Sequence, residues 1–99
     1  MLHIVNKSPF QTSSLDSCLR LARPGSALLL IEDGVYAATT GSEAQERISA
    51  ACSQLKVYAL RPDMDARGVA AKAIDGVTLV DYAGFVDLAA QHHSSQSWL

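Results

Sequence analysis

The two cysteines, Cys18 and Cys52, are the residues with the greatest chemical potential in this chain. Neither belongs to a C-x-x-C pair or to a spacing typical of zinc ligands, so a disulfide framework or a metal site has no support. Cys18 is the stronger candidate for carrying a persulfide, which requires a stabilised thiolate. It lies about four residues into its predicted helix, however, beyond the turn where the helix dipole lowers a thiol pKa. Cys18 can therefore be a sulfur carrier or a small buried hydrophobic residue, and the pattern favours burial; for Cys52 packing is favoured more strongly still.

Charged side chains that follow the predicted strands form a second group. Glu32 with Asp33 can be an acidic pocket for a metal or a turn that opens a helix, and turn chemistry favours the latter. Arg67 and Gly68 follow on a loop or short helix beside Arg61, where a small anion can be held. A solvated surface is the more ordinary interpretation of that segment.

The histidines do not form a recognisable site. His92 and His93 are adjacent, and neighbouring residues on a helix point about 100 degrees apart, so the two cannot chelate one ion. His3 lies within the first predicted strand, where a core or interface role is favoured over catalysis. The chain has no G-x-G-x-x-G or Walker sequence, so no nucleotide cofactor is indicated.

The elements that position these residues alternate between strands and helices. Short apolar runs bounded by turn signals predict strands at Leu2–Val5, Ala27–Ile31, Lys56–Leu60 and Val77–Val80. Apolar residues at helical spacing predict helices at Leu15–Ala22, with Ser13 or Ser14 as its N-cap, and at Glu43–Cys52 and Tyr82–His92. This alternation is typical of an α/β fold, a three-layer α/β/α arrangement around a small, mainly parallel sheet of four to five strands.

Composition limits the classes of function. The length of 99 residues predicts one domain over residues 1–99, and the formal net charge of -2 with scattered Lys and Arg disfavours direct nucleic-acid binding. The longest apolar run is far too short to cross a membrane, so we expect a cytoplasmic protein without a membrane segment. Only 18% of the residues are charged, which indicates a surface that meets a partner.

The end of the chain carries two opposed signals. Ser94–Ser97 is polar enough for a flexible tail, whereas Trp98-Leu99 is apolar. Burying a tryptophan contributes roughly 1.5 to 3 kcal/mol or more. We therefore expect Trp98 to pack against its own core or against another subunit.

Segments spread over the whole chain resemble the TusB/DsrH family in their order and spacing. These segments are Met1-Leu2-His3, Asn6-Lys7-Ser8-Pro9-Phe10, Leu28-Leu29-Leu30-Ile31-Glu32-Asp33-Gly34-Val35, Lys56-Val57-Tyr58-Ala59-Leu60, Asp65-Ala66-Arg67-Gly68, Val80-Asp81-Tyr82, Phe85-Val86 and Gln96-Ser97-Trp98.

The resemblance implies a DsrEFH-like subunit of a heterohexamer, with TusC/DsrF-like and TusD/DsrE-like chains as its partners. Such complexes receive sulfur as a cysteine persulfide from an upstream carrier and pass it to a downstream one. In the TusBCD form the sulfur becomes the 2-thio group of a wobble uridine in tRNA, and in the DsrEFH form it belongs to the oxidation of stored sulfur. In such complexes the main acceptor cysteine lies on the TusD or DsrE subunit. The resemblance therefore makes Cys18 an auxiliary persulfide candidate in an accessory subunit that needs no cofactor.

Two features point to different branches of the family. The segment Ser14–Leu19, with Cys18, is similar to DsrH members, whereas His93–Gln96 is similar to TusB. The leading hypothesis is an interaction subunit in tRNA thiolation, and the alternative is a DsrH-type subunit in which Cys18 carries the persulfide. A nucleotide or anion binder on a flavodoxin-like scaffold is a third hypothesis, disfavoured by the missing glycine loop.

Overall fold

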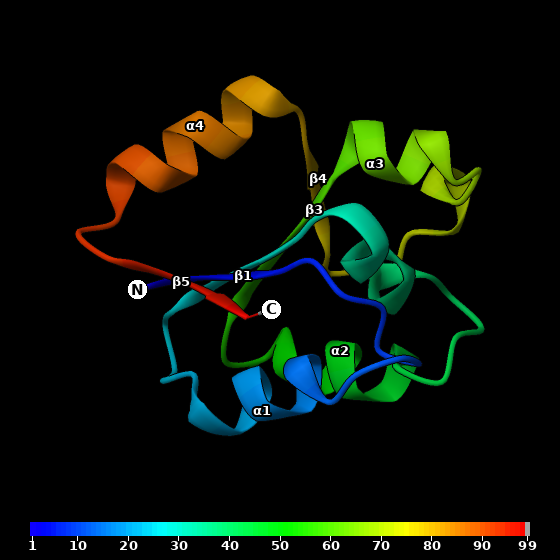
Figure 1. The fold of residues 1–99 in the computed structure, drawn as a ribbon, viewed down its shortest axis with the longest axis horizontal. Coiled ribbons are helices and arrows are strands. Elements are labelled where there is room, and N and C mark those ends of the chain that lie inside the picture. The colour runs from blue at the N-terminus through cyan, green and yellow to red at the C-terminus, as the bar shows by residue number, and fades with distance from the viewer. Residues whose placement is uncertain (99) are drawn as a thin grey trace.

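A five-stranded parallel sheet forms the centre of the molecule (Figure 1), and the computed structural model describes residues 1–98 of the chain. The strands are β1 (Leu2–Val5), β2 (Ala27–Leu30), β3 (Lys56–Leu60), β4 (Thr78–Val80) and β5 (Ser95–Trp98). Their order in the sheet is β4-β3-β2-β1-β5, with every neighbouring pair parallel. All four residues of the central strand β2 are buried, as a strand covered on both faces requires.

The helices form a layer on each face of this sheet. The α-helices are α1 (Ser14–Leu21), α2 (Gln45–Ala51), α3 (Arg61–Ala66) and α4 (Tyr82–Gln91), and the 3-10 helices are η1 (Glu32–Ala38) and η2 (Ala70–Lys72). Figure 1 shows α1 and α2 on one side of the sheet and α4 on the other. The predicted three-layer α/β/α fold is thereby confirmed, with five strands, all of them parallel.

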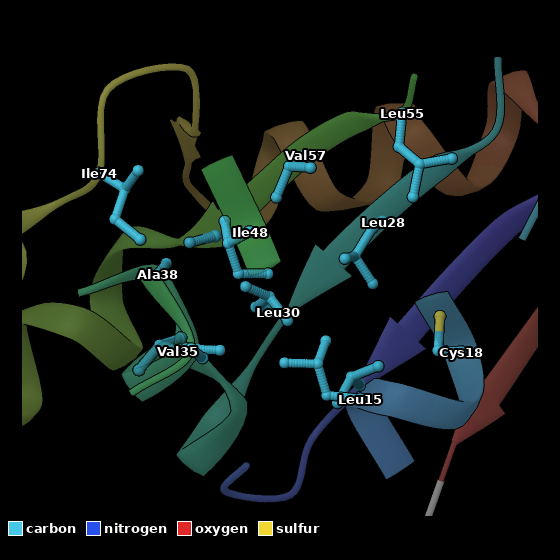
Figure 2. Packing of buried hydrophobic residues seen from close by; sticks show 14 of the residues in the cluster. Leu15, Cys18, Leu28, Leu30, Val35, Ala38, Ile48, Leu55, Val57 and Ile74 are labelled. Atoms are coloured by element: carbon cyan, nitrogen blue, oxygen red, sulfur yellow. The ribbon is translucent and has the colours of Figure 1, made fainter. Parts of the chain in front are cut away.

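The two faces of the sheet differ in how completely they are covered. Alternate residues of each strand point to opposite faces. Leu28 and Leu30 of β2 lie in the larger cluster with residues of α1, α2 and η1, which Figure 2 shows from close by. Leu29 belongs to a smaller cluster under α4, where Leu88 is the only buried residue of the helix. The α4 face is therefore the thinner half of the core.

The predicted helices all exist, with small differences at their ends. The second begins at Gln45 rather than after Ser42, because Ala44 occupies the N-cap position and the preceding residues form turns. The last ends at Gln91, one residue before the predicted end. Asp81 caps its N-terminus, since the carboxylate accepts a hydrogen bond from the Gly84 N–H at 2.8 Å.

Two segments at the carboxyl ends of the strands are helical. The acidic segment after β2 was expected to be a turn that opens a helix, and the 3-10 helix η1 already begins at Glu32. The Arg61-Pro62-Asp63 segment, which follows the predicted strand Lys56–Leu60, is the first turn of α3. Proline is favoured in a first helical turn because its missing N–H has no intrahelical acceptor there.

Strand β5 lies in the polar segment whose structure the sequence left open. It pairs along the whole of β1, from Leu2 with Ser95 to Val5 with Trp98. Trp98 packs against the larger cluster, and its indole N–H donates to Nδ1 of His3 at 3.2 Å. The expectation that Trp98 packs on its own core is confirmed, whereas Leu99 lies outside the described residues.

Deleting Gln96–Leu99 should destabilise the fold, because it removes most of β5 and the contacts of Trp98. We expect a loss of roughly 2 to 4 kcal/mol in the free energy of unfolding. Urea unfolding of the full chain and of the deletion variant measures this difference. A Trp98→Phe variant, which keeps the strand and an aromatic ring but loses the indole N–H and part of the packed ring surface, should lose less. Equal stability of all three proteins would show that β5 is dispensable.

No helix among residues 1–98 combines the length and apolar character needed to cross a bilayer. The longest, α4, has 10 residues, against about 20 for a membrane-spanning helix.

Candidate functional site

Loops from three strands meet at the carboxyl edge of the sheet, where ligands bind in most open α/β folds. The Asn6 side-chain amide donates to a carboxylate oxygen of Glu32 at 3.3 Å, which joins the loop after β1 to the loop after β2. The backbone N–H of Glu32 donates to Oδ2 of Asp63 in α3 at 2.6 Å. Asn6, Glu32 and Asp63 are far apart in sequence, and parallel strand pairing brings them together. We call this group, with Asp33 and Arg67, the edge cluster.

The backbone at the start of η1 is tightly constrained. Glu32 has a φ of 50°, in the left-handed region that non-glycine residues rarely adopt. At Gly34, a Cβ atom would overlap the carbonyl oxygen of Val5 and lie 3.0 Å from its carbonyl carbon. Only glycine allows η1 to approach the end of β1 this closely. The edge cluster is thus held by backbone geometry as well as by side-chain hydrogen bonds.

Arg67 is engaged within the protein. Its Nε and Nη2 both donate to Oδ1 of Asp33, at 3.0 and 2.9 Å, and Nη1 donates to the carbonyl oxygen of Asp63 at 3.1 Å. The guanidinium also lies 6.0 Å from the centre of the Tyr36 ring. This arrangement ties α3 to η1, so Arg67 is less solvated than the sequence analysis favoured and its donors are already directed at carboxylate and carbonyl oxygens. Arg61 takes no part in this arrangement. Its Nε lies 3.9 Å from Oδ2 of Asp65, and both side chains are exposed on α3.

The edge cluster contains no Ser, Thr or Cys nucleophile, and its carboxylates are not arranged to hold a metal ion. Three carboxylates, from Glu32, Asp33 and Asp63, accompany the single guanidinium of Arg67, so the edge does not attract phosphate. Among residues 1–98, no group of three or more His, Cys, Asp or Glu side chains is arranged to hold a metal ion. The acidic-pocket hypothesis for Glu32 and Asp33 therefore has no support from the geometry.

Cys18 lies inside the core on α1, away from the edge cluster. Its side chain is fully buried and packs with Leu15 in the larger cluster (Figure 2). Burial raises the pKa of the Cys18 thiol to about 11, which leaves the thiolate scarce at neutral pH. A groove of about 550 Å³ runs between α1 and α2, and Leu19 lines it whereas Cys18 does not. The burial favoured by the sequence pattern is confirmed.

Cys52, directly after α2, is half-buried and also a free thiol. Burial raises its pKa as well. Its Sγ would lie 3.2 Å from a Cβ atom added at Gly76, so the thiol packs against the turn before β4. Both thiols of the chain are therefore placed as packing groups, and neither belongs to the edge cluster.

The histidines do not share a common site. His92 is half-buried at the end of α4, where Nδ1 lies 2.8 Å from the carbonyl oxygen of Leu88, and His93 is exposed. His3 is buried beside Trp98, with ring centroids 6.1 Å apart. The sequence indicated that His3 and Trp98 each lie near the core or an interface. It gave no signal that the two side chains contact each other, because β5 was not predicted.

Comparison with known proteins places the chain in a family. The family model described as "DsrH like protein" matches residues 7–95. "Protein TusB" of Pectobacterium parmentieri is 40% identical over 98 residues, covering 99% of this chain and 100% of its own length. "Protein TusB" of Escherichia coli K12 gives the same identity and coverage.

Solved structures agree in fold. The ychN protein from E. coli superposes with a TM-score of 0.85 at 23% identity, covering 97% of each chain. The protein of unknown function MTH1491 from Methanobacterium thermoautotrophicum gives a TM-score of 0.75 at 17% identity, covering 97% of this chain and 95% of its own. At these identities the likeness concerns the fold alone, whereas the sequence matches over nearly the full length carry the assignment: the chain is a member of the TusB/DsrH family.

Proposed function

We propose that this chain is the interaction subunit of a cytoplasmic sulfur-relay complex that supplies sulfur for 2-thiolation of the tRNA wobble uridine. Membership of the TusB/DsrH family supports the relay, and relatives named TusB at 40% identity support the tRNA branch over sulfur oxidation. In this proposal a TusD-like partner supplies the reacting cysteine. Cys18 is at most auxiliary, because its thiol is buried and largely protonated.

The observation that carries the proposal is the outer side of α4. The helix has the sequence YAGFVDLAAQ, in which Asp87 is the only charged residue. Tyr82 and Val86, one turn apart, are 61% and 65% exposed. An exposed helix face with large apolar side chains and a single charged residue is typical of a surface that a partner covers, so we infer that a partner covers the outer side of α4.

The sheet face under α4 extends this apolar surface. Ile4, Ile31, Tyr58, Val80 and Phe85 pack against the smaller cluster but are only partly buried. We assign the outer side of α4 and these flanking side chains to the interface with a TusC-like or TusD-like subunit. A stable interface of this kind buries more than roughly 1,000 Å² in total.

The distribution of charge supports a role for this chain in assembly, with tRNA binding carried out by other components of the relay. The chain has 8 Lys and Arg against 10 Asp and Glu, and its edge cluster is rich in carboxylates. Binding of tRNA requires a cationic surface, which we assign to other components of the relay. Sulfur then moves between cysteines of the partner subunits and the upstream and downstream carriers.

A charge on the outer side of α4 should block assembly without unfolding the chain. We expect Val86→Asp to reduce recovery of the complex from co-expressed TusC-like and TusD-like subunits by about 10-fold or more, because a buried unpaired carboxylate opposes association. Size-exclusion chromatography at micromolar concentration measures the assembly. Circular dichroism of the isolated variant checks that it folds.

Leu21→Asp is the matched control, because Leu21 is 67% exposed on α1, at the other face of the sheet. This control should assemble like the unmodified chain. Normal recovery of the Val86→Asp complex, or equal loss in both variants, would contradict the assignment of α4 to the interface. Separate elution of all three unmodified subunits would contradict the proposed function itself.

A further inference from the structure

A second cavity lies at the opposite end of the sheet from the edge cluster. It has a volume of about 400 Å³ and lies where β5, β1 and β2 meet the chain that follows α1. Its lining includes His3, Arg23, Ser26, Gln96 and Trp98. Strand register explains why these side chains meet, since His3 pairs with Gln96 and Leu2 pairs with Ala27, one residue after Ser26. Side chains at alternate positions of neighbouring parallel strands share one face.

Two polar side chains that line this cavity are more than nine-tenths buried. His3 is 4% exposed and Ser26 is 7% exposed. Nδ1 of His3 accepts a hydrogen bond from the Trp98 indole N–H. An indole nitrogen can only donate, so Nδ1 carries no proton and the proton of the neutral imidazole lies on Nε2.

Both side chains retain unused donors. Within residues 1–98, the Nε2–H of His3 and the hydroxyl of Ser26 have no hydrogen-bond partner. Neither donor is among the fully buried side-chain atoms that lack a partner in the described residues, so both remain accessible from the cavity. Burial, together with the α-amino group of Met1, lowers the pKa of His3, so the imidazole is a neutral donor near pH 7. The cavity therefore presents donors that lack acceptors.

The remaining lining residues define what kind of acceptor fits. Arg23 adds a guanidinium and Gln96 a side-chain amide, while the indole of Trp98 forms an apolar wall. A guanidinium with neutral N–H and O–H donors suits a carboxylate, and the indole suits an apolar or aromatic group attached to it. We propose that this cavity binds an aromatic carboxylate, with His3 and Ser26 donating to its oxygens and Arg23 balancing its charge.

This assignment is independent of the sulfur relay and involves neither cysteine nor the outer side of α4. The carboxylate can belong to a free small acid or to the C-terminus of a peptide, and both present the same chemistry. The chain contains a single tryptophan, and Trp98 lines the cavity. Intrinsic tryptophan fluorescence therefore reports on this site alone.

The test is a fluorescence titration of the full chain with phenylacetate and with the tripeptide acetyl-Gly-Gly-Phe. We expect a saturable change with a Kd of about 1 mM or tighter for at least one of the two, and the tighter binder identifies the source of the carboxylate. The neutral counterparts, phenylacetamide and the amidated tripeptide, should bind about 10-fold more weakly or not at all. Absence of saturation by either acid up to about 20 mM, or equal binding of acids and amides, would overturn the proposal.

Two variants separate the proposed site from non-specific binding. Arg23→Gln should weaken binding about 10-fold, whereas Arg20→Gln removes an equal charge on α1 outside this cavity and should leave binding unchanged. Both arginines are exposed, so neither change should unfold the chain. Equal binding by the two variants would assign the fluorescence change to general electrostatics and overturn the site.

Discussion

Replacing Gly34 with alanine should be among the most destabilising single substitutions in the chain. The added Cβ would overlap the carbonyl oxygen of Val5, and both groups belong to backbone that is fixed by the sheet and by η1. Relief requires η1 to move away from β1, which would also strain the hydrogen bonds of the edge cluster. We expect a loss of about 3 kcal/mol or more in the free energy of unfolding, at the upper end of overpacking costs. Urea unfolding measures it as a lower midpoint with an unchanged slope.

Gly41→Ala is the control for adding a methyl group where it meets no neighbouring atom and only the backbone conformation is unfavourable. Gly41 has a φ of 85°, and an added Cβ there meets no atom within 4 Å. This substitution should cost only about 1 to 2 kcal/mol, from the left-handed conformation alone. Equal losses in the free energy of unfolding for Gly34→Ala and Gly41→Ala would contradict this prediction, because they would show that η1 can move away from β1 without an energetic cost.

The Cys18 thiol should be almost unreactive in the native protein. Its pKa of about 11 leaves roughly 300-fold less thiolate at neutral pH than an ordinary cysteine with a pKa of about 8.5. Because Cys18 is fully buried, a reagent can reach its thiol only when the surrounding structure opens locally. We expect native Cys18 to react with iodoacetamide at least about 100-fold more slowly than the same residue in urea, as followed by mass spectrometry of peptides. Half-buried Cys52 is the internal comparison and should react faster; native labelling of Cys18 at the unfolded rate would contradict the packing.

The raised pKa also predicts how stability depends on pH. Because the folded state holds the Cys18 proton more tightly than the unfolded state, this stabilisation is complete below about pH 8.5 and is lost as pH rises toward 11. A Cys18→Ser variant should lack this loss of stability at alkaline pH.

The Cys18→Ser variant should also lose about 1 to 3 kcal/mol in the free energy of unfolding at neutral pH, since the hydroxyl enters an apolar site. Under the proposed function, persulfide delivery by the assembled complex should persist in the variant, and complete loss of transfer in an intact complex would make Cys18 a persulfide carrier of the relay.

The sequence predicted the elements whose signal is local. The continuous apolar run at Ala27–Leu30 is a buried central strand, and the spacing of Leu15, Cys18 and Leu19 is a helix that packs on one side. Strand β5 could not be predicted, because Ser95–Ser97 has no apolar pattern and is held by pairing with β1 and by the anchor Trp98. A polar edge strand takes its structure from its neighbour rather than from its own composition.

The contacts within the edge cluster could not be predicted from a single sequence. The sequence indicated charged side chains directly after the predicted strands, and the carboxyl ends of parallel strands share one edge of the sheet. The particular bonds from Glu32 to Asp63 and from Arg67 to Asp33 depend on η1 and α3, whose helical form the sequence only partly indicated. The left-handed conformation of Glu32 has no local signal, because glutamate has no preference for that region.

Strand β5 also determines when this chain can finish folding during its synthesis. The first strand made, β1, pairs with Ala27–Leu30 on one side, but its other edge waits for Ser95–Trp98, the last segment described. A nascent chain therefore exposes one edge of β1 until Ser95–Trp98 has been synthesised and can pair with it, and an open strand edge is a site for pairing with other chains. The five-stranded sheet can be complete only after this last described segment has left the ribosome.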